Sequence, residues 1–144
     1  MLLLGEGEKV TAQNVGDVLK LSVQLHDKSL LDVLLDRFVE LAEPALASSV
    51  VKAMSELLDL SLDGMLERVG KVKKMKSSNS FYKEILLSCQ VEIKDAEQLL
   101  ADKKISLDKD GVEDFLQFCY GDKYVSYKRK RFFIDLIKKP FRSK

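Results

Sequence analysis

The stretch SLLDVLLDRFVELAEPALASSVVKAMSELLDL, Ser29 to Leu60, decides the fold of this chain. Its first part, Ser29–Leu41, carries apolar residues on more than one side of a helix, which predicts a deeply buried helix. Pro44 can begin a helix but cannot continue one. After Pro44, apolar residues recur at helical spacing: Leu46, Val50, Val51, Met54, Leu57 and Leu58. The stretch therefore predicts two helices joined by a short turn, the second of them amphipathic over Ala45–Leu60.

In the remainder of the chain, apolar residues also recur at helical spacing, and short polar breaks separate the segments. Further helices are expected over Ala12–His26, from a capping Ser61 to Val72, after the loop Ser77–Ser80, over Ile93–Ala101, from Val112 to Cys119 with Gly121 closing it, and over Tyr124–Lys138 before Pro140. No segment alternates in the manner of a strand. We therefore expect an all-α fold of about eight helices in antiparallel pairs, arranged as a helical bundle or a short solenoid.

Composition agrees with a packed helical domain. Hydrophobic residues make up 46% of the 144 residues and charged residues 33%, which is too apolar for a disordered chain. Seven Gly and two Pro offer little turn chemistry for a β-sandwich. The 24 basic and 23 acidic residues nearly cancel, so the charge of the whole chain does not indicate nucleic acid or membrane.

The charge is nevertheless unevenly distributed, because nine basic residues and a single acid, Asp135, follow from Lys123 onward. The candidate binding residues in this segment are Lys128, Arg129, Lys130, Arg131, Lys138, Lys139 and Arg142. Three interpretations are open: a nuclear-localisation-like cluster, a basic amphipathic helix for anionic lipid or nucleic acid, or a helix docked on the body. We favour docking of the apolar face (Phe132, Phe133, Leu136 and Ile137), since the rest of the chain is net acidic and can receive it.

Candidates for chemistry are few. His26 is the only histidine, and a helix-end position favoured by the helix dipole explains it better than catalysis does. Zinc needs about four ligands, so Cys89 and Cys119 are better interpreted as free, buried or half-buried thiols. There is no glycine-rich phosphate loop. We expect no catalytic, cofactor-binding or metal-binding residues, and hence no enzyme.

Two cysteines make no disulfide framework, which favours a reducing compartment. The apolar run Met1–Leu4 ends at Gly5, too early for a signal peptide, and no window approaches the length of a membrane span. We expect a cytoplasmic or nuclear protein, or both. The start of the chain suggests a piece cut from a larger protein.

Two stretches carry a family resemblance. The first, KVTAQNVGDVLKLSVQLHDKSLLDVLLDRFVEL from Lys9 to Leu41, resembles the segment that closes a BTB/POZ domain and opens the helical region after it. The matching positions are Thr11, Asn14, Val15, Val18, Leu19, Leu25, Ser29, Leu30, Leu31 and Phe38. The second, NSFYKEILLSCQVEIKDAEQLLADKKISLDKDGVEDFLQFCYG from Asn79 to Gly121, resembles the later part of a BACK domain. Its matching positions are Phe81, Ile85, Leu99, Leu100, Leu107, Val112, Phe115 and Leu116.

The resemblance implies a protein-interaction module, a substrate adaptor of a cullin-type ubiquitin ligase whose partners include a cullin-type scaffold. Three parts are expected in order along the chain. Residues 1–10 are a leading segment that is flexible or left over from excision out of a larger protein, 11–122 are a BACK-like helical domain, and 123–144 are a basic C-terminal helix and tail packed on that domain. The alternative function is binding of nucleic acid or an anionic lipid surface through the basic segment. Self-association is a further expectation, because the apolar start Leu2–Leu4 and the Phe-rich end would associate if no other surface covered them.

Overall fold

The computed structural model describes residues 10–107 and 111–142, with side chains described up to residue 137. Within these residues the chain forms eight α-helices and no strand, which confirms the predicted all-α class. The helices are α1 (Val15–Gln24), α2 (Lys28–Leu41), α3 (Pro44–Glu56), α4 (Leu62–Gly70), α5 (Ser78–Ser88), α6 (Ile93–Ala101), α7 (Val112–Tyr120) and α8 (Asp122–Arg142).

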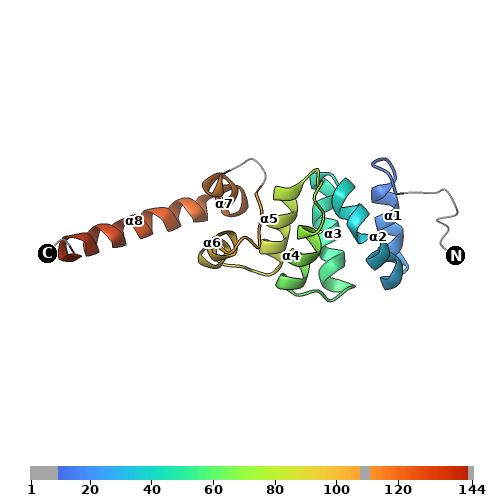
Figure 1. Ribbon diagram of the computed structural model, residues 1–144, viewed down its shortest axis with the longest axis horizontal. Coiled ribbons are helices and arrows are strands. Elements are labelled where there is room, and N and C mark those ends of the chain that lie inside the picture. The colour runs from blue at the N-terminus through green and yellow to red at the C-terminus, as the bar shows by residue number, and fades with distance from the viewer. Residues whose placement is uncertain (1–9, 108–110, 143–144) are drawn as a thin grey trace.

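The helices are arranged as an elongated stack (Figure 1). Helices α1 to α5 lie side by side in the larger part, and α6 and α7 form a smaller layer beyond α5. Helix α8 leaves this layer as a long arm, so α1 and the last turns of α8 lie at opposite ends of the molecule. This shape exposes different surfaces at the two ends.

The core is centred on the contact between α3 and α5, which is the most extensive helix pairing in the molecule. Phe38, Phe81, Tyr82 and Phe115 are its largest fully buried aromatic side chains. Helix α2 buries Leu31, Leu35, Phe38 and Val39, yet its Val33 is 75% exposed. The expectation that α2 is buried on more than one side was therefore wrong, because no helix packs over its outer face.

Several predicted helix ends are confirmed. Pro44 is the first residue of α3, where its missing N–H costs nothing. The Ser61 side chain accepts a hydrogen bond from the Gly64 N–H at 3.2 Å and caps α4. Gly121 ends α7 with a φ of 59°, a conformation in which a Cβ would be strained. Helix α6 has the predicted bounds.

Other ends differ from expectation. Asp27, not Ser29, caps α2, and its carboxylate accepts from the Leu30 N–H at 3.0 Å. Helix α5 begins at Ser78, so most of the predicted serine loop is its first turn, a place where serine is well tolerated. Helix α8 runs to Arg142 and does not end before Pro140. Proline removes one hydrogen bond and crowds the preceding turn, which disfavours a helix without forbidding it.

Candidate interaction surface on α8

The first turns of α8 are anchored by two tyrosines. Tyr124 and Tyr127 are three residues apart and so share a face of the helix. Tyr124 is only 4% exposed and Tyr127 is half-buried. Their rings stack with centroids 6.4 Å apart. Burial is the main cause that raises the pKa of Tyr124 above its ordinary value. This face therefore attaches the root of α8 to the layer formed by α6 and α7.

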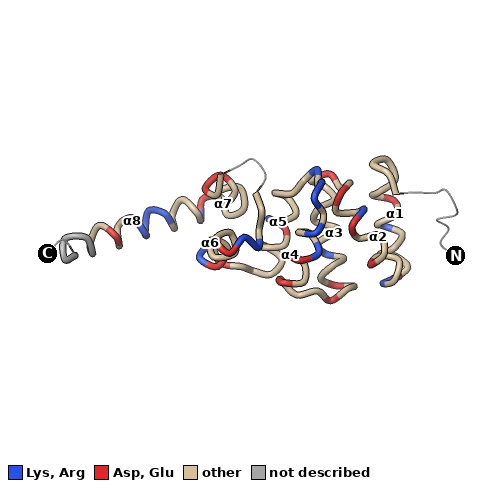
Figure 2. The backbone as a smooth tube through the Cα atoms, viewed as in Figure 1, with Lys and Arg blue, Asp and Glu red and all other residues tan. Residues whose placement is uncertain are grey.

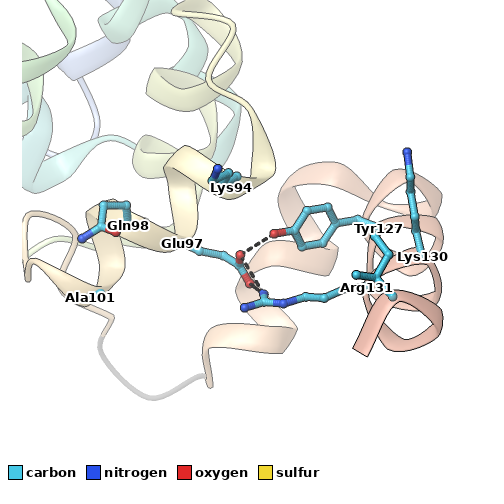
Figure 3. Close-up of a pocket in the computed structure, with 8 residues that line it drawn as sticks. Lys94, Glu97, Gln98, Ala101, Tyr127, Lys130 and Arg131 are labelled. Atoms are coloured by element: carbon cyan, nitrogen blue, oxygen red, sulfur yellow. Dashed lines mark hydrogen bonds and ion pairs between the residues drawn. The ribbon is translucent and has the colours of Figure 1, made fainter. Parts of the chain in front are cut away.

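Glu97 of α6 holds the same face of α8 through a carboxylate (Figure 3). The Tyr127 hydroxyl donates a 2.7 Å hydrogen bond to Oε1 of Glu97. Nη1 of Arg131 donates to both carboxylate oxygens of Glu97 at 3.1 Å. The hydrogen bond to an ionised carboxylate favours the neutral phenol, so it raises the pKa of Tyr127, and burial adds to the effect. Glu97 thus links α6 to two successive turns of α8.

A second ion pair joins α8 to α7. Nζ of Lys128 lies 2.7 Å from Oε1 of Glu113 and 5.3 Å from the centroid of the Tyr124 ring. The hydrogen bond from Lys128, followed by the charge of its ammonium, lowers the pKa of Glu113. The same bond raises the pKa of Lys128. Because both groups lie in solvent, the pair orients α8 more than it stabilises it.

The structure divides the basic cluster Lys128–Arg131 between two faces of α8. Lys128 and Arg131 are three residues apart and pair with acids of the body. Arg129 and Lys130 are exposed, and within the described residues neither has an ion-pair partner. Figure 3 shows the Lys130 side chain pointing away from Glu97. The predicted residues Lys138, Lys139 and Arg142 lie outside the described side chains.

The second half of α8 carries a stripe of large apolar side chains in solvent. Four residues form this apolar stripe and are 51% to 65% exposed: Phe132, Phe133, Leu136 and Ile137. The expectation that they dock on the acidic body was wrong. A continuous straight helix cannot fold back on the layer to which its first turns are fixed, so the stripe is carried away from the body (Figure 1). Within 123–137, where side chains are described, only the first turns of α8 pack on the body.

A hollow of about 700 Å³ lies in the angle between α6 and α8. Lys94 and Glu97 line it from α6, and Tyr127, Lys130 and Ile134 line it from α8. A second hollow of about 510 Å³ shares Lys94 and Tyr127 with the first. The walls combine half-buried apolar side chains with charged edges, which is the composition of a protein interface rim.

Four exposed apolar side chains lie at the opposite end of the molecule: Leu21, Val23 and Leu25 from the α1 side and Val33, the most exposed of them, from α2. Asp32 and Asp36, which flank Val33, are exposed acids. The molecule therefore presents an apolar surface at each end, with a basic surround on α8 and acids beside the other.

The single histidine and the two cysteines lie elsewhere. His26 is exposed in the turn between α1 and α2, with a φ of 50°. Cys89 is half-buried and Cys119 buried, and both are free thiols as predicted. Burial raises the pKa of Cys119 to about 12, which keeps its thiol protonated at neutral pH. Among the described residues, no three side chains of the metal-ligating types lie close enough together to hold an ion.

Sequence reasoning identified the cations of α8 but missed the acids and tyrosines that position them. The spacing of Tyr124, Tyr127 and Arg131 is that of one helix face and was available as a signal. Glu97 was not, because it lies 34 residues from Arg131 along the chain and meets it only in the folded molecule.

No protein-family model, no curated protein and no solved structure matches this chain. None of the helices in the described part of the chain has both the length and the apolar character that a bilayer span requires.

Proposed function

We propose that this chain is a non-catalytic protein-interaction module that works as an adaptor, with one partner at the α1–α2 end and another at α8. The observation that carries the proposal is the pair of exposed apolar surfaces at opposite ends of an elongated helical stack (Figure 1). Large apolar side chains exposed close to one another mark sites where a partner can cover them. Two such surfaces far apart suit a molecule that joins two others.

The resemblance to the BTB–BACK segment supports a particular adaptor class. Lys9–Leu41 carries the first part of that resemblance, and it contains the α1–α2 pair with its exposed Val33. We propose that α1 and α2 contact a cullin-type scaffold and that the α8 end contacts the second partner. Helix pairs offer grooves and apolar ridges to such partners, so the contact needs no chemistry beyond packing and charge.

Binding of a purified cullin N-terminal region to the immobilised full chain tests this assignment. We expect saturable binding, and Val33→Asp should weaken it about tenfold, because it places a charge in the centre of the contact. Val112→Asp is the matched control: it changes an exposed valine at the first position of α7, far from α1 and α2, and should leave the affinity unchanged. No binding, or an equal loss in both variants, would remove the cullin assignment.

Nucleic-acid or anionic-lipid binding is the second candidate function. The charge of residues 123–144 supports it, with nine basic residues and one acid. The pairing of Lys128 with Glu113 and of Arg131 with Glu97 weighs against it, because two of the four clustered cations are already neutralised. A salt titration separates the two functions, since contacts to phosphate weaken steeply with added salt. No binding to nucleic acid or liposomes at low salt eliminates this candidate.

A further inference from the structure

The outer face of α8 combines cations and apolar side chains in one helical register. Arg129 precedes Phe132 by three residues and Phe133 by four, and Lys130 precedes Phe133 by three and Ile137 by seven. Residues at these spacings lie on one face of a helix. Lys128 and Arg131 lie nearer the face that carries Tyr124 and Tyr127 and pair with acids of the body, whereas Lys130 lies at the border of the two faces and also lines the hollow between α6 and α8. The outer face is thus a basic, aromatic-rich ridge, and it is exposed throughout its described length.

This ridge gains little support from the rest of the molecule. Between Phe132 and Ile137 no ion pair or side-chain hydrogen bond joins the described side chains of α8 to the body, and the apolar stripe is more than half exposed. Most helical stability in proteins comes from packing of an amphipathic face. A partner that covers the apolar stripe would therefore stabilise the second half of α8.

Charge repulsion disfavours a second copy of α8 as the partner that covers the apolar stripe. Between Asp122 and Ile137 the helix has five basic and two acidic residues, so two paired copies bring like charges together (Figure 2). An anionic bilayer is also disfavoured, because residues 1–122 carry 22 acids against 15 bases and would be repelled by a surface that holds α8 close to it. A groove in a protein engages the helix alone. It must be apolar within and acidic at its rim.

Resting on the proposed function, we propose that the outer face of α8 is the binding helix for an acidic, methionine-lined groove of the calcium-loaded EF-hand sensor type. Basic amphipathic helices with bulky anchors are the ligands of such grooves. Phe132, Phe133, Leu136 and Ile137 enter the groove, where flexible methionines adapt to their shapes. Arg129 and Lys130 meet the acidic rim. Because such a groove opens only when calcium is bound, the second contact of the adaptor becomes calcium-dependent.

Calcium-loaded calmodulin is the probe, titrated against the full chain by calorimetry with and without a calcium chelator. We expect a one-to-one complex in calcium and a loss of at least about tenfold in affinity in the chelator. Two matched variants carry the same change of charge on opposite faces. The outer pair Arg129→Gln/Lys130→Gln should weaken binding about tenfold, and the inner pair Lys128→Gln/Arg131→Gln less than about threefold.

The variant Phe132→Ser/Phe133→Ser should abolish measurable binding, while circular dichroism confirms that the body stays folded. Absence of binding in calcium overturns the proposal. An equal loss of affinity in the two glutamine double variants also overturns it, because binding would then depend on the net charge of α8 and not on its outer face. Binding to phosphatidylserine vesicles through the same phenylalanines, with none to calmodulin, assigns the face to membranes instead. Because the cullin test uses α1 and α2, a negative result here leaves the adaptor function standing and separately testable.

Discussion

The hydroxyl of Tyr127 donates a 2.7 Å hydrogen bond to Glu97, thirty residues earlier in the chain. The same carboxylate receives the guanidinium of Arg131 at 3.1 Å. Glu97 on α6 acts together with Glu113 on α7, which pairs with Lys128, and with the buried Tyr124 to set the direction in which α8 leaves the body. That direction carries the apolar stripe into solvent.

Replacing Glu97 should loosen the root of α8 without unfolding the core. We expect Glu97→Ala to speed amide hydrogen exchange in residues 124–131 and to lower the free energy of unfolding by about 1 kcal/mol or less, since Arg131 is largely exposed. Exchange measured by mass spectrometry locates the effect. Asp36→Ala removes an exposed carboxylate of α2 and is the control. Similar exchange in both variants would contradict the linking role of Glu97.

Two phenylalanines of equal size should differ widely in their contribution to stability. Phe81 is fully buried between helices, so Phe81→Ala should lower the free energy of unfolding by about 3–5 kcal/mol. Phe132 is 62% exposed, so Phe132→Ala should change the free energy of unfolding by less than about 0.5 kcal/mol. Urea unfolding followed by circular dichroism measures both. A large loss from Phe132→Ala would show that the stripe is covered in solution, for instance by a second copy.

Alkaline pH should destabilise the fold through its tyrosines. Burial, with smaller contributions from Cys119 and Asp95, raises the pKa of Tyr120 to about 12 from an ordinary 10.0. Below pH 10 the group is neutral in both states and has no effect. Between pH 10 and about 12 the unfolded chain releases this proton and the folded chain keeps it, so stability falls as pH rises.

The unfolding midpoint measured at successive pH values checks this expectation. In Tyr120→Phe the decline above pH 10 should be shallower, while the values at pH 7 to 9 show the separate cost of losing the hydroxyl, which donates to the Val91 carbonyl at 2.8 Å. The remaining tyrosines also have raised pKa values and should produce the residual slope. An unchanged slope in the variant would refute the assignment to Tyr120.

The two thiols should react at different rates with a thiol reagent at pH 8. Cys89 is half-buried at the end of α5, and burial raises its pKa modestly. Cys119 is buried with a pKa of about 12, so almost none of it is thiolate. We expect one thiol per chain to be modified rapidly and the second only on unfolding. Peptide mapping identifies the sites, and rapid labelling of Cys119 would contradict its burial.

Much of the secondary structure could be predicted from local patterns. Pro44, Ser61 and Gly121 act through their own backbone geometry and their nearest neighbours, so their roles were visible in the sequence. Errors arose where two local signals competed. Asp27 and Ser29 are both residue types that cap helices, and in the structure it is the Asp27 carboxylate that accepts the Leu30 N–H. Pro140 is a strong helix-ending signal that did not end α8.

The sequence by itself determined that this protein is all-helical and where its apolar faces and its excess of positive charge lie. Helical period, caps and charge are properties of neighbouring residues. The tertiary structure alone decided that the face of α8 with Phe132 and Phe133 stays in solvent and that Glu97 and Glu113 take two of the four clustered cations. The physical reason is that an ion pair across 34 residues, such as Arg131 with Glu97, forms only once packing has placed α6 beside the root of α8.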